Sequence, residues 1–182
     1  MRVQIGVITT YDDVPREVAE KARRLARKLV ELGCIVITGG DGGVMKIIAE
    51  EVQRAGGIAV GILPIEAEEW SEEHPWHNPY NTVEIRTGMT YTARSAIVVR
   101  SSDAIILVAG GAGSLTELAM AYNTGIPVVV LTGTGLLADE LRKRFPEGYL
   151  DHRRLVKLTY ATTPEEAAEK AYELALERRR RS

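Results

Sequence analysis

The chain has 182 residues, of which 45% are hydrophobic and 26% charged, so it is long enough to bury a core and fits a single domain spanning 1–182. Its formal net charge of −2 provides no broad basic surface, which argues against nucleic acid as a partner. The single cysteine, Cys34, excludes a disulfide within the chain, and neither a membrane-spanning run nor a signal peptide is recognisable, so we expect a cytoplasmic protein with no membrane partner.

Short apolar runs rich in β-branched residues alternate with longer stretches of helical periodicity. The predicted elements, in chain order, are a strand over 3–8, a helix over 15–32, a strand over 34–38, a helix over 43–55, a strand over 58–63, a long irregular segment over 64–81, a short strand over 82–87, a helix over 90–101, a strand over 103–108, a helix over 114–124, a strand over 127–131, a helix over 135–144, a strand over 154–159 and a helix over 164–179. We therefore predict an α/β, Rossmann-like three-layer fold, with a mostly parallel sheet of about 6–7 strands and helices on both faces.

Two glycine-rich turns follow predicted strands: "TGGDGGVM" (38–45) and "AGGAGS" (109–114). Both stand where a parallel strand ends and a helix begins, which is the edge of an open α/β sheet that binds ligands. Glycines let the backbone approach an anion closely, and the free N–H groups and the helix dipole attract negative charge. The pattern predicts that one cleft holds a phosphate-bearing ligand, with contacts from Gly39, Gly40, Gly42, Gly43, Gly110, Gly111, Gly113 and Ser114.

The common nucleotide and metal motifs are missing from the sequence. No G-x-x-x-x-G-K-[ST] motif is present, which excludes a P-loop nucleotide hydrolase. The first strand leads into "TTYDDVP" rather than G-x-G-x-x-G, and Thr116 stands where a third glycine would follow Gly113, so NAD and FAD are disfavoured. His74 and His77 lack a third ligand nearby, and we predict no metal site.

Ser114 and Glu117 allow two interpretations. Their spacing matches a capping box, in which both side chains bond free backbone N–H groups at a helix start. Thr163 and Glu166 have the same spacing without a glycine turn, and there a cap alone explains the pattern. Because Ser114 follows a glycine cradle, we place Glu117 in the ligand site, while the capping alternative stays open.

Arg94 is the second candidate for the site. On the predicted helix over 90–101 its neighbours at three and four residues are apolar or aromatic, so its charge needs a partner. That partner is either a buried carboxylate or the phosphate or base of a ligand, which the planar guanidinium suits.

The two turns and the stretch "RTGMTYTARSAIVVRSSDAIILVAGGAGSLTELAMAYNTGIPVVVL" resemble, in sequence and order, the Lonely Guy-like superfamily. That superfamily is marked by P-G-G-x-G-T-x-x-E and was once widely labelled "possible lysine decarboxylase". The resemblance covers nearly the whole chain and is closest to the molybdenum cofactor carrier protein-like branch. It implies a Rossmann-like fold and a homo-oligomer, either a dimer or a dimer of dimers.

In cytokinin-activating members of the superfamily, a phosphoribohydrolase cleaves the N-glycosidic bond of a nucleoside 5′-monophosphate. The resemblance implies that Arg94 and Glu117 would be catalytic in such an enzyme, with AMP giving adenine and ribose 5-phosphate. Here Ala109 and Ser114 replace the Pro and Thr of the motif, and an Arg-Ser pair replaces the usual Arg-Lys pair. A lysine decarboxylase would need a pyridoxal phosphate lysine, and Lys46 is better explained as a helix-surface residue.

The departures from the hydrolase motif favour the carrier-like branch. We therefore predict a small cytoplasmic protein that binds a phosphorylated heterocycle, either a nucleotide or a molybdenum cofactor-type ligand. The alternative is a nucleoside 5′-monophosphate phosphoribohydrolase, and a ligand-sensing module for protein partners would use the same pocket.

Overall fold

The computed structural model of the chain describes residues 1–181. Within them lie the strands β1 (Gln4–Ile8), β2 (Ile35–Thr38), β3 (Ile58–Leu63), β4 (Val83–Arg86), β5 (Ala104–Val108), β6 (Val128–Leu131) and β7 (Thr159–Ala161). The helices are α1 (Arg16–Glu31), α2 (Gly43–Arg54), α3 (Tyr91–Arg100), α4 (Ala112–Asn123), α5 (Leu136–Arg144), α6 (Pro164–Arg181) and the short 3-10 helix η1 (Ile65–Glu69).

The strands form one sheet in the order β4-β3-β2-β1-β5-β6-β7, and every neighbouring pair is parallel. This confirms the predicted α/β fold with a parallel sheet. The chain builds outward from β1 to β4, returns to place β5 beside β1, and then builds the other half of the sheet. The strand order therefore reverses between β1 and β5, which is the position where open α/β sheets bind ligands.

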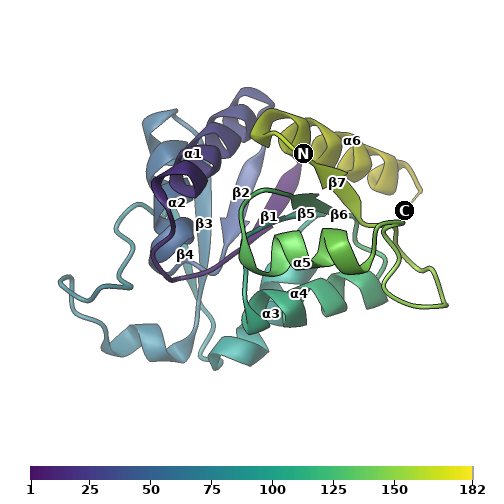
Figure 1. The fold of residues 1–182 in the computed structure, drawn as a ribbon. Coiled ribbons are helices and arrows are strands. Elements are labelled where there is room, and N and C mark those ends of the chain that lie inside the picture. Colours follow the sequence, from purple (N-terminus) through teal and green to yellow (C-terminus); the bar gives the residue numbers. More distant parts are fainter. Residues whose placement is uncertain (182) are drawn as a thin grey trace.

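Helices cover both faces of the sheet and form the predicted three layers (Figure 1). One apolar cluster packs α1, α2 and α6 against one face and includes Leu25, Ile48 and Ala171. The other packs α3, α4 and α5 against the opposite face and includes Val98 and Leu118. Because β1 leads to a helix on one face and β5 to a helix on the other, the loops that leave these two central strands diverge and open a crevice.

The predicted strand over 154–159 is wrong in its position. The observed strand β7 begins at Thr159, where it pairs with Val129 of β6. Arg154 has a left-handed backbone with φ of 49°, and its N–H bonds the Asp151 carbonyl in a turn, so the preceding segment is not extended. Its apolar residues resemble those of a strand, but within the predicted span only Thr159 belongs to the sheet.

Three further observations concern single residues or elements. Cys34, which directly precedes β2, is buried. Helix α4 begins at Ala112, two residues before the predicted start, and this difference changes the environment of Ser114. None of the helices in residues 1–181 has the length and apolar content that crossing a membrane requires.

Candidate functional site

A pocket of about 420 Å³ opens at the carboxyl ends of the central strands, in the crevice between β1 and β5. Its walls come from the loop after β1, the first glycine turn, α3 and the amino end of α4, with Trp76 contributed by the long segment before β4. The pocket therefore lies where the strand order predicts a ligand site. We call this cavity the switch-point pocket.

The amino end of α4 opens into this pocket. The first helical hydrogen bond joins the Leu115 N–H to the Gly111 carbonyl at 2.9 Å, so the N–H groups between these residues have no partner inside the helix. No side chain in residues 1–181 caps this end. A Cβ atom added at Gly111 or Gly113 would meet nothing within 4 Å, so both backbones face open space. The helix dipole adds positive potential there, which makes this end suited to an anion.

The turn that leads into α4 is held in a fixed conformation. Gly110 has a left-handed φ of 86°, and a Cβ there would crowd the Ser114 side chain, so a side chain is excluded on both grounds. Ala109, which stands at the motif's proline position, also has a positive φ of 54°. Its N–H bonds the Thr134 hydroxyl at 2.9 Å. The turn is thus anchored to the neighbouring loop and keeps the helix end aimed at the pocket.

The capping alternative for Ser114 and Glu117 does not hold. Ser114 lies in the third helical position, and its hydroxyl donates to the Thr9 carbonyl at 2.8 Å rather than accepting from the helix. Glu117 accepts a hydrogen bond from the Ser95 hydroxyl at 3.1 Å and lines the pocket.

The comparison motif in α6 behaves as a cap. The Glu166 N–H donates to the Thr163 hydroxyl at 3.2 Å, and the Glu166 carboxylate accepts from the Thr162 N–H at 2.9 Å. Proline at position 164 fixes the start of α6 directly after Thr163. In contrast, the glycine turn lets α4 begin earlier, which leaves Ser114 and Glu117 free for other contacts.

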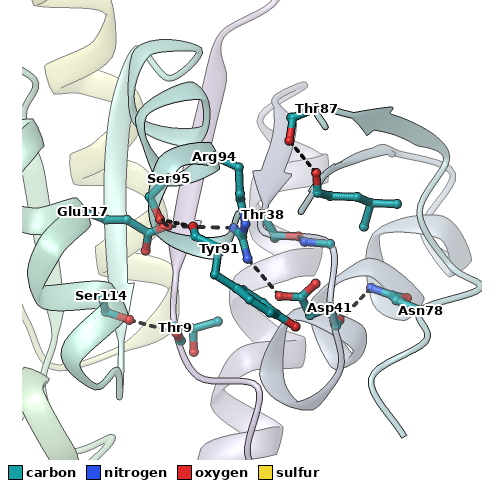
Figure 2. Close-up of polar contacts among 12 residues, drawn as sticks. Thr9, Thr38, Asp41, Asn78, Thr87, Tyr91, Arg94, Ser95, Ser114 and Glu117 are labelled. Atoms are coloured by element: carbon teal, nitrogen blue, oxygen red, sulfur yellow. Dashed lines mark hydrogen bonds and ion pairs between the residues drawn. The ribbon is translucent and has the colours of Figure 1, made fainter. Parts of the chain in front are cut away.

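Arg94 projects from α3 between two carboxylates (Figure 2). Its Nη2 atom lies 2.8 Å from Oδ2 of Asp41, and its Nη1 atom lies 3.9 Å from Oε1 of Glu117. The three side chains are 7%, 1% and 9% exposed, respectively. Of the two kinds of partner that the sequence left open for Arg94, the structure thus supplies the buried carboxylate, contributed by Asp41 of the first glycine turn.

Burial changes the proton affinity of this cluster. Desolvation raises the pKa of Asp41 to about 7, and the charge of Glu117 adds to the effect, although Arg94 opposes both. Desolvation also raises the pKa of Glu117, against the lowering effects of Arg94 and the Ser95 hydroxyl. Tyr91 has a raised pKa for the same reason and because Asp41 is near, so it remains a phenol that can donate a hydrogen bond. Two carboxylates share one cation, and protonation relieves their repulsion.

Most of the buried polar atoms without a hydrogen bond lie around this pocket. Within residues 1–181 these atoms include Thr9 Oγ1, Asp41 Oδ1, the Tyr91 hydroxyl and Arg94 Nε, all on residues that line it. A fifth such atom, Oε2 of Glu66, belongs to a residue outside the lining. Buried polar groups normally have partners, so these atoms indicate positions where a ligand or water completes the hydrogen bonding.

The first glycine turn contributes to the pocket mainly through Gly39 and Asp41. A Cβ at Gly39 would collide with the Arg94 guanidinium, so glycine is what lets Arg94 lie across this backbone. Gly42 and Gly43 instead pack against the backbones of Trp76 and Tyr11, and Gly40 packs against Gly61 and the Leu63 side chain. These three glycines and Gly110 are outside the lining of the switch-point pocket, whereas Gly39, Arg94, Gly111, Gly113, Ser114 and Glu117 are part of it.

Several residues that line the pocket were not predicted from the sequence. Asp41 lies inside the first glycine turn, but no feature of the sequence marks it as the partner of Arg94. Tyr11 and Trp76 have ring centroids 4.8 Å apart and form one rim of the pocket. Trp76 belongs to the long irregular segment over 64–81, and the aromatic residues of that segment were the available signal. Within residues 1–181, no three His, Cys, Asp or Glu side chains are grouped so that they could hold a metal ion.

Comparison with known proteins places this geometry in a family. The model of the SLOG cluster4 family matches residues 2–168. An uncharacterised protein from Archaeoglobus fulgidus is 36% identical over 129 residues, which cover 71% of this chain and 80% of that protein. The crystal structure of the protein TM1055 is 33% identical with a TM-score of 0.83, covering 95% of this chain and 99% of that one.

Two further solved structures carry names that state a ligand. The molybdenum cofactor carrier protein MCP from Chlamydomonas reinhardtii is 29% identical with a TM-score of 0.78, covering 97% of this chain and 99% of that one. The molybdenum cofactor binding protein from Rippkaea orientalis is 26% identical with a TM-score of 0.77, covering 96% and 98%. The predicted resemblance to Lonely Guy-like proteins, and to their carrier branch in particular, is thereby confirmed.

Proposed function

This chain belongs to the SLOG cluster4 family, and we propose that it binds a phosphorylated heterocycle, of the molybdenum cofactor type or a nucleotide, in the switch-point pocket. The observation that carries the proposal is the uncapped amino end of α4, where Gly111 and Gly113 leave backbone N–H groups facing the pocket. The names of the carrier and binding proteins among its structural relatives support this class of ligand.

The size and polarity of the pocket suit such a ligand. A volume of about 420 Å³ lies within the range of about 300–1,000 Å³ that is common for small-molecule sites. The anionic group would lie at the amino end of α4, where the Ser114 side chain is held by Thr9 and does not compete for the N–H groups. The unpartnered atoms of Asp41, Tyr91 and Arg94 would then bond the polar edge of the heterocycle.

Native mass spectrometry of freshly purified protein tests the proposal. We expect a mass excess over the bare chain that is lost on denaturation, and a small molecule containing phosphorus in the released fraction. The same spectrum counts subunits, and from the resemblance we expect a homo-oligomer, either a dimer or a dimer of dimers. Bare chain that also fails to take up added phosphorylated ligands would contradict the proposal.

Substitution of the two buried partners sharpens this test. Arg94→Ala leaves Asp41 and Glu117 without their cation, so the pocket becomes more negative and an anionic ligand should bind more weakly. Glu117→Gln keeps the volume and the contact with Ser95 while removing one negative charge, so its effect on binding should be smaller. The opposite order of effects would contradict the assigned roles.

A phosphoribohydrolase is the second candidate, because Arg94 and Glu117 both line the pocket. In that reaction a carboxylate beside the sugar stabilises a developing oxocarbenium charge or activates water. The binding proposal predicts that protein incubated with AMP releases little or no adenine. Ready release of adenine and ribose 5-phosphate, abolished in Glu117→Gln, would establish the hydrolase instead.

A further inference from the structure

The inner wall of the switch-point pocket carries more negative than positive groups. Asp41 and Glu117 face the single cation Arg94, and all three are at least nine-tenths buried. A phosphate would be repelled at such a wall, whereas a group that donates hydrogen bonds would be attracted. The anionic and the neutral parts of a ligand should therefore lie at different ends of the pocket.

Asp41 has a free acceptor at this wall. Its Oδ2 atom bonds Arg94 at 2.8 Å, and its Oδ1 atom is buried without a partner in residues 1–181. Asp41 is 1% exposed and lines the pocket, so the empty lone pairs are available only to a molecule that enters it. Two unpartnered donors, the Tyr91 hydroxyl and Arg94 Nε, line the same cavity, and Figure 2 shows both side chains extending from α3 toward Asp41.

The surroundings of Asp41 suit a flat ring. Trp76 packs directly against Gly42, the residue after Asp41, and its ring lies 4.8 Å from that of Tyr11. The loop after β1 joins the two ends of the pocket, because Ser114 bonds its Thr9 carbonyl while Gly43 packs against its Tyr11 backbone. The aromatic rings thus lie beside the turn that carries Asp41, and Figure 2 shows Ser114 and Glu117 of α4 on the opposite side of Arg94 from Asp41.

We propose that Asp41 determines ligand specificity by accepting hydrogen bonds from a 2-amino-4-oxopyrimidine edge, the edge that guanine and pterins share. This inference rests on the proposed function and adds the chemical identity of the ring. The ring N–H and the exocyclic amino group of that edge both donate, and a carboxylate accepts both. The adjacent ring carbonyl accepts from Tyr91 or Arg94. Adenine instead presents a ring acceptor beside its amino group, and Asp41 as a carboxylate cannot satisfy it.

Replacing Asp41 with asparagine changes one of the two hydrogen-bond acceptors at this position into a donor. The Asn side chain keeps one acceptor and gains an N–H donor, which matches the 2-oxo group of xanthine and opposes the 2-amino group of guanine. A reversal of preference between two ligands of nearly equal size is informative because damage to the fold would weaken the binding of both. Glu66→Gln is the matched control, since Glu66 lies near enough for its charge to raise the pKa of Asp41 but does not line the pocket.

The test is calorimetric titration, at pH 8 where Asp41 is mainly a carboxylate, of protein freed of copurified ligand with GMP, XMP, AMP and ribose 5-phosphate. We expect the native chain and Glu66→Gln to bind GMP about 10-fold more tightly than XMP or AMP, and Asp41→Asn to prefer XMP over GMP. Equal binding of the three nucleotides, or an equal loss for all of them in Asp41→Asn, would overturn the assignment of Asp41 alone. Failure of all four probes to bind would overturn the proposed function and this inference with it.

Discussion

Asp41→Asn is expected to remove a loss of stability that the native chain suffers as the pH rises. In the folded protein burial raises the pKa of Asp41 from its ordinary value of 3.8 to about 7. Between these two values the folded chain holds a proton that the unfolded chain has released. The free energy of unfolding therefore has its full value below about pH 4 and falls as the pH rises toward 7. Asparagine does not titrate, so the variant lacks this contribution.

The magnitude follows from the interval between the two pKa values. Each pH unit over which only the folded state is protonated corresponds to about 1.4 kcal/mol, so the interval of about three units corresponds to about 4 kcal/mol. Between pH 4.5 and pH 8 the titration covers most of it, or about 3 kcal/mol. Groups whose shifted pKa values do not depend on Asp41, such as Glu166, are present in both proteins and cancel in the difference.

Urea denaturation of both proteins, followed by circular dichroism at pH 4.5, 6 and 8, measures this effect. The variant should be close to the native chain in stability at pH 4.5 and more stable by about 3 kcal/mol at pH 8. A carboxylate retained at that cost is typical of a functional group rather than a structural one. A difference between the two proteins that stays constant over this pH range would refute the reasoning, because Asp41 would then be ionised with an ordinary pKa.

Two further predictions concern the turns around the pocket. Ser114→Ala should lower the free energy of unfolding by about 1 kcal/mol in urea denaturation, since it removes the 2.8 Å hydrogen bond to Thr9; an unchanged value would mean that water replaces the bond fully. Gly39→Ala should cost about 1–3 kcal/mol in the same measurement because its Cβ would displace the Arg94 guanidinium from its buried ion pair with Asp41. Gly113→Ala, which lies inside α4 and whose Cβ meets no atom within 4 Å, should not lower the stability. Equal effects of the two glycine substitutions would contradict the packing described for the first turn.

The fold was largely predictable because its central strands are buried on both faces. Every residue of β5 and β6 is buried, so their sequences are continuous apolar runs that indicate a parallel sheet. The edge strand β7 has only three residues, and its pairing with β6 depends on where the loop after α5 ends. A local run of apolar residues does not reveal that long-range register, which is why the predicted strand was misplaced.

The sequence predicts the parts of the candidate site that depend only on short segments of the chain. The glycines before α4 and the charge of Arg94 on an apolar face are properties of short segments, and the structure places Gly111, Gly113 and Arg94 on one pocket. The partner of Arg94 is 53 residues away in the chain, and only the order of β2, β1 and β5 in the sheet brings it close. Contacts of that kind follow from strand order, which a single sequence does not specify.

The two glycine turns show why the same residue pattern requires different explanations. In the first turn, Gly39 and Gly43 are glycines because Arg94 and the Tyr11 backbone occupy the space of a side chain. In the second turn, nothing fills the space beside Gly111 and Gly113, although a side chain would fit there. Steric need therefore explains the first pair, while the second pair has no steric reason within the described residues. A ligand that approaches the backbone closely would supply that missing reason, and this contrast is the structural basis for locating the anion at the amino end of α4.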